Sequence, residues 1–341
     1  MIISSAAATG EMESDDHEDA DILADTADYE LRHAVVPVES HGQRLDLSLV
    51  QVVPEFSRSY LQQLVEAGAV ACNGSTMIKS SARVKAGDRL SIELRPTPQS
   101  QAFKPELIKL DVVYEDSHIL VIDKPAGLVV HPAPGNWSGT LLNGLLALDV
   151  LAATLPRAGI VHRLDKDTSG LMVVARTRQA MDQLVQMIAA RNVSRQYLAV
   201  AHNAWEGAKT RQIDLSVGRD VKNRLRMAVV DLAKNSGKTA STTIALIENS
   251  AGHCLVRCKL HTGRTHQIRV HMAAIGHSLL ADEVYGGVRE HGLHRQALHA
   301  CELGFEHPVT GEVMRFKSQP PKDIQVAMFQ IGLSYNLEAN I

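Results

Sequence analysis

A dense polar loop followed by a buried strand constrains this chain more than any other feature. Residues 159–170 (GIVHRLDKDTSG) place two carboxylates, two cations, an imidazole and two hydroxyls between glycines. The next residues, 171–175 (LMVVA), are uncharged and β-rich, which predicts a strand buried in a sheet. A polar loop anchored on a core strand is a common way to hold reactive side chains on a rigid scaffold. The pattern also fits a salt-bridged surface turn, so on composition alone the loop is only a candidate site.

Length and composition indicate an ordinary globular protein. The 341 residues are enough for two domains with buried cores, and charged residues make up 21% of the chain. No uncharged run reaches the length of about eighteen residues that a membrane helix needs. The N-terminus lacks a basic segment followed by an apolar stretch, so a secretory signal is not expected. We therefore expect a cytoplasmic protein that does not bind a membrane.

The charge of the chain is unevenly distributed. The formal net charge is -3, but residues 1–30 contain ten carboxylates and no Lys or Arg, which leaves 35 basic against 28 acidic residues in the remainder. Such a basic body suits a nucleic-acid backbone, because each Lys or Arg contact with a phosphate releases condensed counterions. We expect residues 1–35 to be a disordered acidic tail. The tail either solubilises the protein or competes with RNA for the basic surface.

The sequence shows no metal-binding or cofactor-binding pattern. The four cysteines form no C-x-x-C pair, and Cys254 and Cys258 share one face of a predicted strand, where they are expected to fill the core. The sixteen histidines are scattered, and no H-E-x-x-H motif occurs. Neither a phosphate-binding loop nor a dinucleotide-binding loop is present. We expect a protein without a metal or a cofactor.

Residues 38–95 have the pattern of a small helical and hairpin module. Apolar spacing predicts a helix over 44–52 and a second helix that begins after Ser57 and ends at Gly68. Asn73 and Gly74 predict a tight turn between two strands. The cations of this module that we expect to contact a polyanion include Arg44, Arg58 and Lys79.

The remainder of the chain predicts an α+β domain. Residues 96–106, with two prolines near their start, are interpreted as a linker, and residues 107–330 as a second domain. Strand-like runs outnumber the helices, which suggests a large, mostly antiparallel mixed sheet. The strand-like runs lie at 112–114, 119–123, 171–175, 197–201, 242–247 and 254–260, and the helices near 140 and at 178–191 and 265–275.

Several motifs, in a fixed order over residues 107–320, resemble the RluA/RluD family of pseudouridine synthases. Besides the loop at 159–170, they are 124–132 (KPAGLVVHP), 195–200 (RQYLAV), 262–271 (TGRTHQIRVH), 298–300 (LHA) and 307–308 (HP). Residues 156–158 (PRA), which lead into the loop, look most like the RluD type, which acts on large-subunit ribosomal RNA. The module at 38–95 resembles the S4-like RNA-binding domain through QRLD, SRS and VACNG.

The resemblance implies an enzyme that isomerises uridine to pseudouridine in large-subunit (23S) ribosomal RNA, in a cleft across the middle of a large sheet. The bond from the ribose anomeric carbon to N1 of uracil breaks, the base turns, and a bond to C5 forms. Because nothing is oxidised, no cofactor is required. The reaction needs a carboxylate that attacks the anomeric carbon or removes a ribose proton, and the sequence leaves both routes open. The target nucleotide must first be flipped out of its stack.

The motifs also imply roles for individual residues. Asp165 resembles the catalytic carboxylate, Tyr197 the residue whose ring stacks on the target base, and Arg269 the arginine that pairs with the carboxylate. Arg163 resembles the arginine that fills the space left by the flipped uridine. The other residues of the motifs that we expect to contact the RNA are His162, Lys166 and Arg264.

Alternative functions remain open at this point. The chain could modify another ribosomal site or transfer RNA, or it could be a non-catalytic RNA-binding regulator that uses the S4-like module. A glycoside hydrolase is disfavoured because sugar-binding clefts are rich in aromatic residues, which make up only 4% here. Two departures from the RluD type bear on site selection. The stretch between Gly287 and Arg295 is short where RluD-type proteins have a longer insertion, and the acidic tail is not part of the family pattern.

Overall fold

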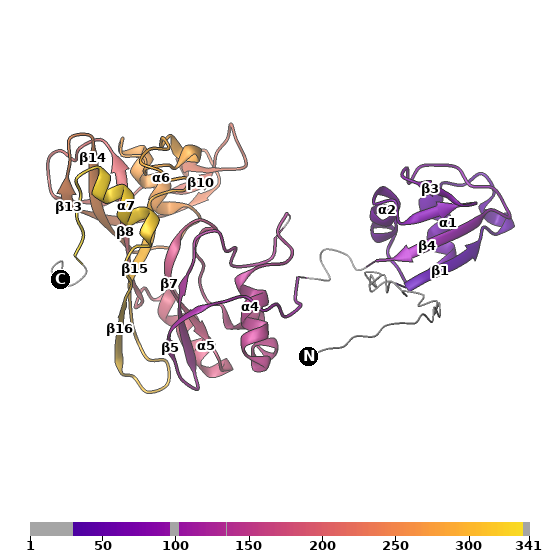
Figure 1. Ribbon diagram of the computed structural model, residues 1–341, viewed down its shortest axis with the longest axis horizontal. Helices are drawn as coiled ribbons and strands as arrows, with labels where there is room; N and C mark the ends of the chain where they lie inside the picture. Colours follow the sequence, from indigo (N-terminus) through magenta and orange to yellow (C-terminus); the bar gives the residue numbers. More distant parts are fainter. Residues whose placement is uncertain (1–29, 96–101, 134, 337–341) are drawn as a thin grey trace, which may run out of the picture. The chain divides into compact units, whose positions relative to one another are not determined.

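The computed structural model describes residues 30–95, 102–133 and 135–336, which fall into two compact units (Figure 1). The first unit ends at Thr97 and the second begins at Pro98. Each unit has a hydrophobic core of its own, as expected of separate domains. Residues 1–29 of the expected tail and residues 96–101 of the expected linker lie outside the described residues.

The first unit joins two helices to a four-stranded antiparallel sheet. Its elements are β1 (Glu30–Val35), α1 (Leu45–Val52), α2 (Arg58–Glu66), β2 (Val70–Cys72), β3 (Ser75–Met77) and β4 (Arg89–Leu94). The strand order is β1-β4-β2-β3. The Ser57 hydroxyl accepts a hydrogen bond from the Tyr60 N–H (3.3 Å), which caps α2 as predicted. Asn73 and Gly74 both have positive φ and form the predicted turn between β2 and β3.

Strand β1 corrects the expected extent of the acidic tail. We expected no structure before residue 36, yet Glu30–Val35 pairs antiparallel with β4 along its whole length. Most of its side chains remain at least partly exposed. The strand is therefore held mainly by backbone hydrogen bonds to a sheet edge, which leave no hydrophobic pattern in the sequence for a prediction to detect.

A nine-stranded mixed sheet is the framework of the second unit. The order is β5-β6-β7-β15-β8-β14-β13-β9, and β16 pairs with β15. Within the described residues only β7 and β15 pair in parallel, so the predicted α+β class with a mostly antiparallel sheet is confirmed. Its strands are β5 (Asp111–Glu115), β6 (Ile119–Lys124), β7 (Ser169–Ala175), β8 (Ser194–His202), β9 (Thr210–Ile213), β13 (Thr242–Asn249), β14 (His253–Leu260), β15 (Leu298–Glu306) and β16 (Val313–Lys317).

Helices cover both faces of this sheet. They are α4 (Leu141–Leu148), α5 (Arg178–Ala189), α6 (Gln267–Ala274) and α7 (Lys322–Gln330). A small sheet of β10 (Val217–Arg219), β11 (Met227–Val229) and β12 (Gly237–Lys238) packs against α6. In β6, Leu120 and Ile122 belong to the core shared with α4 and α6, whereas Ile119 and Val121 belong to the core shared with α5. Burial on both faces explains why the strand is an unbroken apolar run.

The second unit extends beyond the boundaries expected from the sequence at both ends. The carbonyls of Ala102 and Lys104, expected in the linker, accept hydrogen bonds from the Asn143 side chain at 3.3 and 2.8 Å and so belong to this unit. At the other end, Leu333, beyond the expected boundary at 330, packs in a core of this unit. Helix α7 lies within the expected domain but was not predicted. Its buried face consists of Ile324, Ala327 and Met328, a pattern too short to identify a helix from spacing alone.

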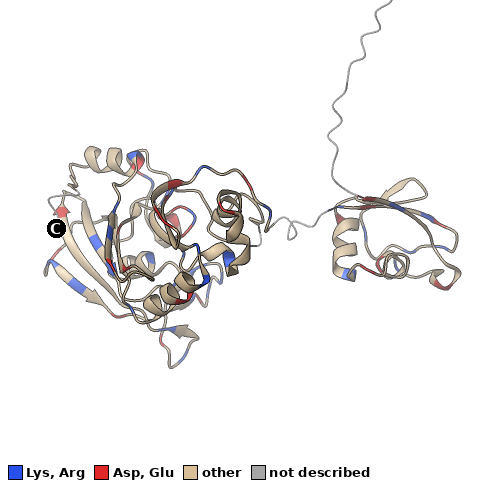
Figure 2. Ribbon diagram, turned by 90° about the horizontal axis from the view of Figure 1, so that it is seen from below, with Lys and Arg blue, Asp and Glu red and all other residues tan. Residues whose placement is uncertain are grey.

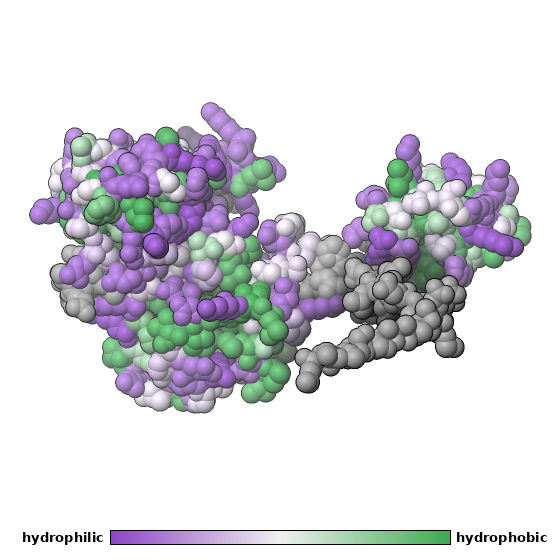
Figure 3. Space-filling model, in the orientation of Figure 1, coloured by the Kyte–Doolittle hydropathy of each residue, from purple (hydrophilic) through white to green (hydrophobic). Residues whose placement is uncertain are grey.

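No helix among the described residues is both long and apolar enough to cross a bilayer. Apolar side chains do reach solvent along β5 and after α4, where they contribute to the green areas of Figure 3. Val112 and Val113 are exposed on β5, Leu148 at the end of α4, and Val150 and Leu151 after it. These residues lie outside the candidate site described below.

The parallel pair β7 and β15 determines where the site lies. Strand β15 runs between β7, which follows the polar loop, and β8, which carries Tyr197. Ala300 of β15 is paired with both Gly170 and Tyr197. Gly170 has φ +117°, and a Cβ atom there would lie 2.4 Å from the Ala300 carbonyl oxygen, so only glycine permits this close approach. The loop and the tyrosine are thus brought to the middle of the sheet.

Candidate active site

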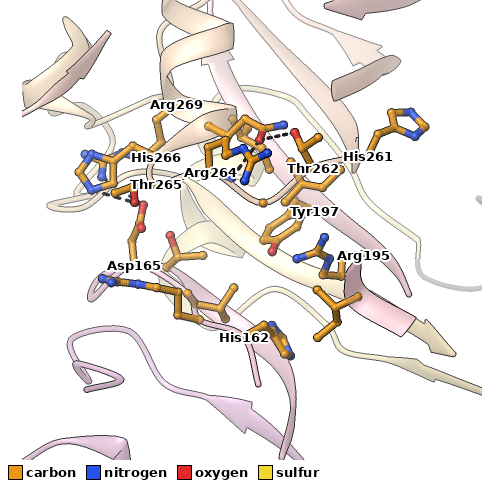
Figure 4. A pocket seen from close by; sticks show the side chains of 18 of the residues that line it. His162, Asp165, Arg195, Tyr197, His261, Thr262, Arg264, Thr265, His266 and Arg269 are labelled. Carbon is orange, nitrogen blue, oxygen red and sulfur yellow. Dashed lines mark hydrogen bonds and ion pairs between the residues drawn. The ribbon is translucent and has the colours of Figure 1, made fainter. Parts of the chain in front are cut away.

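A cleft of about 400 Å³ opens where the polar loop, β8, the end of α5 and the turn before α6 meet (Figure 4). Six of the residues that the sequence assigned to the site lie far apart in the chain, and the structure brings them together in this cleft. These are His162, Arg163, Asp165, Tyr197, Arg264 and Arg269. Lys166, also predicted, is exposed and does not line the cleft.

Side chains behind the loop hold its backbone in place. Arg295 donates to the Asp167 carbonyl at 2.9 Å, and Gln296 donates to the Thr168 hydroxyl at 3.2 Å. The Thr168 N–H donates to the Asp165 carbonyl at 3.1 Å and closes a turn. The loop that carries Asp165 is therefore anchored on both sides of its turn, which favours a fixed position for the carboxylate.

Lys124 is fully buried beneath the same loop. Its ammonium donates to the carbonyls of Pro125 (2.7 Å), Leu128 (2.9 Å) and Lys166 (3.0 Å). Burial lowers the pKa of Lys124 to about 8. The three carbonyls satisfy all three of its N–H donors, so this lysine joins two chain segments and is structural.

A chain of charged contacts orients Asp165. Arg269 donates through Nε and Nη2 to both carboxylate oxygens of Asp282, at 2.7 and 2.8 Å. Its remaining Nη1 reaches Oδ2 of Asp165 at 3.3 Å, and its guanidinium lies 4.9 Å from the ring centre of Tyr285. The two carboxylates raise the pKa of Arg269 against the opposing effect of burial. Because Asp282 already fixes the Arg269 guanidinium, its remaining N–H can bond to a second carboxylate with little further loss of side-chain entropy.

His266 lies on the same side of Asp165. Its Nε2 is 3.9 Å from Asp165 Oδ2, and its Nδ1 is 2.8 Å from the Tyr285 hydroxyl. That hydroxyl also accepts the Met227 N–H at 3.0 Å. In the tautomer in which the hydroxyl donates to Nδ1, a neutral His266 carries its hydrogen on Nε2, which faces Asp165. Burial lowers the pKa of His266, and Asp165 opposes the effect.

The other side of the cleft is formed around Tyr197 (Figure 4). Tyr197 is only 5% exposed, and burial raises its pKa to about 12. Arg195 opposes this shift, and its guanidinium packs against the backbone at Gly263, where a Cβ atom would lie 2.9 Å from Nη1. His162 accepts a hydrogen bond from the Val173 N–H at 3.1 Å, and burial together with Arg195 lowers its pKa to about 3. His162 is therefore neutral at physiological pH.

Positive charge dominates the cleft. Among its lining residues Asp165 is the only carboxylate, against five arginines. Arg163, Arg191 and Arg195 form no ion pair with any described residue, and the Nε of Arg195 is buried without a hydrogen-bond partner. Among the described residues, Lys and Arg are distributed across both units, as Figure 2 shows. The five arginines are Arg163, Arg191, Arg195, Arg264 and Arg269.

Arg264 differs from the free arginines because its side chain supports the turn before α6. Its Nε donates to the Thr239 carbonyl at 3.1 Å, and its N–H donates to the Gln267 side chain at 3.0 Å. Gln267 is buried and also accepts from the Thr262 hydroxyl at 2.7 Å. This motif therefore builds the turn that delivers Arg269 to the cleft.

Two of the three cations predicted in the first unit contact one buried acid. Arg44 and Arg58 both contact Asp46, at 2.9 and 2.8 Å, and together hold the pKa of this fully buried carboxyl well below its usual range. Two arginines on one carboxylate leave a net positive charge in a fixed place. Lys79 is exposed on the same unit. The sequence did not reveal that Arg44 and Arg58 share a partner.

Sequence reasoning missed several residues of the site, among them Asp282, Tyr285, Arg195, Arg191 and His266. Asp282 and Tyr285 follow a buried segment at 279–281, and an acid placed at the end of such an apolar run was a usable signal. Arg195 lies two residues before Tyr197, on the same face of a strand by the period of two, which could have placed both in the cleft.

The comparisons with known proteins agree with this geometry. Residues 118–274 match the family described as RNA pseudouridylate synthase, and residues 43–90 match the S4 domain. The chain belongs to the RNA pseudouridylate synthase family and is an RNA pseudouridine synthase, which confirms the family resemblance seen in its motifs.

Its relatives are similar over most of their length. The chain is 43% identical over 343 residues to "Ribosomal large subunit pseudouridine synthase D" of Neisseria meningitidis serogroup B, covering 96% of this chain and 89% of the relative. The protein of the same name from Pseudomonas aeruginosa is 46% identical, with 86% and 93% covered. Among solved structures, "Human RNA Pseudouridylate Synthase Domain Containing 1" is 26% identical with a TM-score of 0.51, covering 63% of this chain and 85% of that one.

Proposed function

We propose that this chain converts specific uridines of large-subunit ribosomal RNA to pseudouridine, with Asp165 as the catalytic carboxylate. One observation carries the proposal: Asp165 is the only carboxylate lining a cleft of five arginines, and Arg269 holds it in place at 3.3 Å. A polyanionic substrate is attracted to such a cleft. The reaction needs one carboxylate at the ribose, which is what the cleft provides.

Both chemical routes place the same demand on the rest of the cleft. Whether Asp165 attacks the anomeric carbon or removes a ribose proton, the electron pair of the broken bond leaves with the uracil. Arg195 lies beside the aromatic ring of Tyr197 and has no counter-ion in the described structure. We assign it the stabilisation of this negative charge, since a preorganised cation in a shielded cleft is most effective where charge develops.

Tyr197 is assigned the stacking platform for the flipped base and a part in proton movement. Because burial raises its pKa to about 12, the hydroxyl is protonated at neutral pH. It can therefore relay the C5 proton only by donating its own proton while it accepts another. Arg163, which is exposed at the rim and forms no ion pair with a described residue, is assigned the space left by the flipped nucleotide.

Ribosomal RNA as the substrate rests on two further observations. Several relatives at 42–46% identity carry the name ribosomal large subunit pseudouridine synthase D, and the first unit matches an S4 domain. We assign Arg44, Arg58 and Lys79 of that unit, and exposed Lys166 of the second, to contacts with RNA phosphates. The first unit would then add affinity without taking part in the chemistry.

The test is a pseudouridine map of ribosomal and transfer RNA from cells that lack this gene. The missing positions should lie in large-subunit ribosomal RNA. They should return with the wild-type gene but not with Asp165→Asn, which keeps the size of the side chain and removes its charge. The purified variant should lose at least about 10³-fold in turnover with RNA affinity nearly unchanged.

The alternatives give different maps. Loss of pseudouridine from transfer RNA alone would move the substrate to that class of RNA. Restoration of the modification by Asp165→Asn would refute the catalytic assignment. An unchanged map, together with a growth defect that the wild-type gene and the Asp165→Asn gene rescue equally, would favour an RNA-binding regulator.

A further inference from the structure

A second cluster of ionisable side chains lies outside the cleft. His202 ends β8 and His253 begins β14, and antiparallel pairing of these strands places the two residues opposite each other. Glu290 and His291 approach from the short stretch between Gly287 and Arg295. The ring centres of His202 and His253 are 5.3 Å apart, and those of His253 and His291 are 5.7 Å apart. Histidines that are scattered in the sequence therefore surround one carboxylate in the fold.

The donor atoms have the spacing of a metal coordination sphere. His253 Nε2 lies 3.2 Å from Glu290 Oε2, and His291 Nε2 lies 3.6 Å from the same oxygen. Four ligands arranged tetrahedrally at zinc bond lengths are separated by about 3.4 Å. One donor atom each from His202, His253 and Glu290 also lie within 4.8 Å of one another. Small side-chain movements would close this group around an ion.

His253 and Glu290 are close enough for an ion pair, at 3.2 Å, and a cation can equally bridge them. The Nε2 atom of His253 is buried and makes no well-directed hydrogen bond. No Lys or Arg of the described chain forms an ion pair with Glu290. A neutral imidazole whose Nε2 lone pair faces this carboxylate would be stabilised by a cation between the two groups.

We propose that His202, His253 and Glu290 bind one divalent transition-metal ion of the zinc class, and that His291, beside the same carboxylate, is the fourth ligand. Imidazole and carboxylate donors suit zinc. His202 Nε2 accepts the Val288 N–H at 3.0 Å, and this bond is released if Nε2 ligates the ion. Until His291 comes within bonding distance, water completes the sphere. The site is accessible from solvent, since the side chains of His291 and Glu290 are 30% and 38% exposed.

The position of the site defines its role. The ligands Glu290 and His291 follow directly after the segment whose Asp282 and Tyr285 hold Arg269. The Ala281 N–H donates to the Val288 carbonyl at 2.9 Å, which joins the two parts of this segment. A bound ion would tie the segment to β8 and β14 and stabilise it. It would not touch the cleft and would take no part in the isomerisation.

The experiment is a zinc titration of the full chain after it has been stripped with a chelator. Wild-type protein should bind one Zn²⁺ in competition with a chromogenic chelator, and its melting temperature should rise with zinc. His253→Gln and Glu290→Gln should each weaken zinc binding at least about tenfold. His294→Gln is the matched control, because His294 is exposed in the same stretch and is not a proposed ligand. Circular dichroism of the metal-free variants verifies that they fold.

Cobalt provides a second readout that depends on geometry. Co²⁺ in place of zinc should give the intense visible absorption of a four-coordinate site, and Glu290→Gln should abolish it. No saturable one-to-one binding, or equal affinity in wild type and both ligand variants, would overturn the proposal. Neither measurement uses RNA, so their failure would leave the synthase function untouched.

Discussion

The two sides of the cleft balance charge in opposite ways. Around Asp165, the carboxylate, Arg269 and Asp282 form a connected set in which the arginine bonds to both acids. Around Tyr197, Arg195 has no partner acid among the described residues, and the neighbouring His162 is kept neutral. We call the first set, Asp165, Arg269 and Asp282, the carboxylate side. The second set is the arginine side, which consists of Arg195, Arg191, Tyr197 and His162.

This difference distinguishes positioning from ligand binding. A buried charge normally has a partner, because desolvation is costly without one. The carboxylate side meets this rule within the protein, so its groups are fixed before substrate arrives. On the arginine side, the buried Nε of Arg195 meets it only if the ligand supplies a partner. RNA phosphates and a departing uracil both do so, which explains why the enzyme needs no second acid in the cleft.

The largest effect in this comparison is expected for Arg195→Gln. If this cation stabilises charge on the detached uracil, its loss should lower turnover by about 10²- to 10³-fold, as for other donors to a developing anion. RNA affinity should change much less. Single-turnover rates and filter-binding constants, measured for the variant and for Arg195→Lys, separate the two quantities. Equal losses in affinity and rate would show that Arg195 only binds RNA.

Asp282→Asn tests the carboxylate side. The substitution keeps the shape of the side chain but weakens its hold on the Arg269 fork, which also shifts the group that orients Asp165. We expect turnover to fall by about 10²-fold, the usual consequence of a misplacement near 1 Å. RNA affinity should be unchanged because Asp282 is buried and does not line the cleft. Normal turnover would show that Asp282 does not position the catalytic group.

How well the sequence predicts this site depends on how far apart in the sequence the interacting residues lie. Asp165, Tyr197 and Arg269 stand in motifs, and periodicity detects the apolar runs of β7 behind the Asp165 loop, of β8 and of α6. Asp282 bonds to Arg269 through a fold in the segment after α6, and nothing in the local sequence encodes that contact. The same holds for Asp46, which two arginines share, and for His202 and His253, which meet only through strand pairing.

The neutrality of His162 on the arginine side can be tested by acid titration. Its pKa is about 3 in the folded state against 6.5 in the free side chain, so unfolding takes up a proton between these values. The folded state is therefore stabilised above pH 6.5 and loses stability as the pH falls toward 3, by at most about 1.4 kcal/mol per pH unit for this group. His131 and His299, each with a pKa lowered by burial to about 4, add to the slope.

His162→Gln should reduce that slope without removing it. Denaturant unfolding of the variant and of wild type at pH 7, 6 and 5 provides the measurement, and the difference between the two proteins should shrink as the pH falls. Because Gln also replaces a buried hydrogen-bond acceptor, the variant is expected to be less stable at pH 7. A difference in stability that is constant from pH 7 to pH 5 would mean that His162 does not titrate as inferred.

The smallest effect is expected for Arg191→Gln, at the rim of the arginine side. Arg191 follows α5, has φ +66° and is exposed, so it can reach a phosphate next to the flipped nucleotide but not the base platform itself. Removing one phosphate contact should lower RNA affinity severalfold and reduce the slope of log affinity against log salt by about 0.7 to 0.9. Turnover at saturating RNA should stay the same.

Arg178→Gln is the matched control, because Arg178 pairs with Asp182 at the other end of the same helix and does not line the cleft. Fluorescence titration at several salt concentrations gives both slopes, and equal slopes for Arg191→Gln and wild type would show that Arg191 contacts no phosphate.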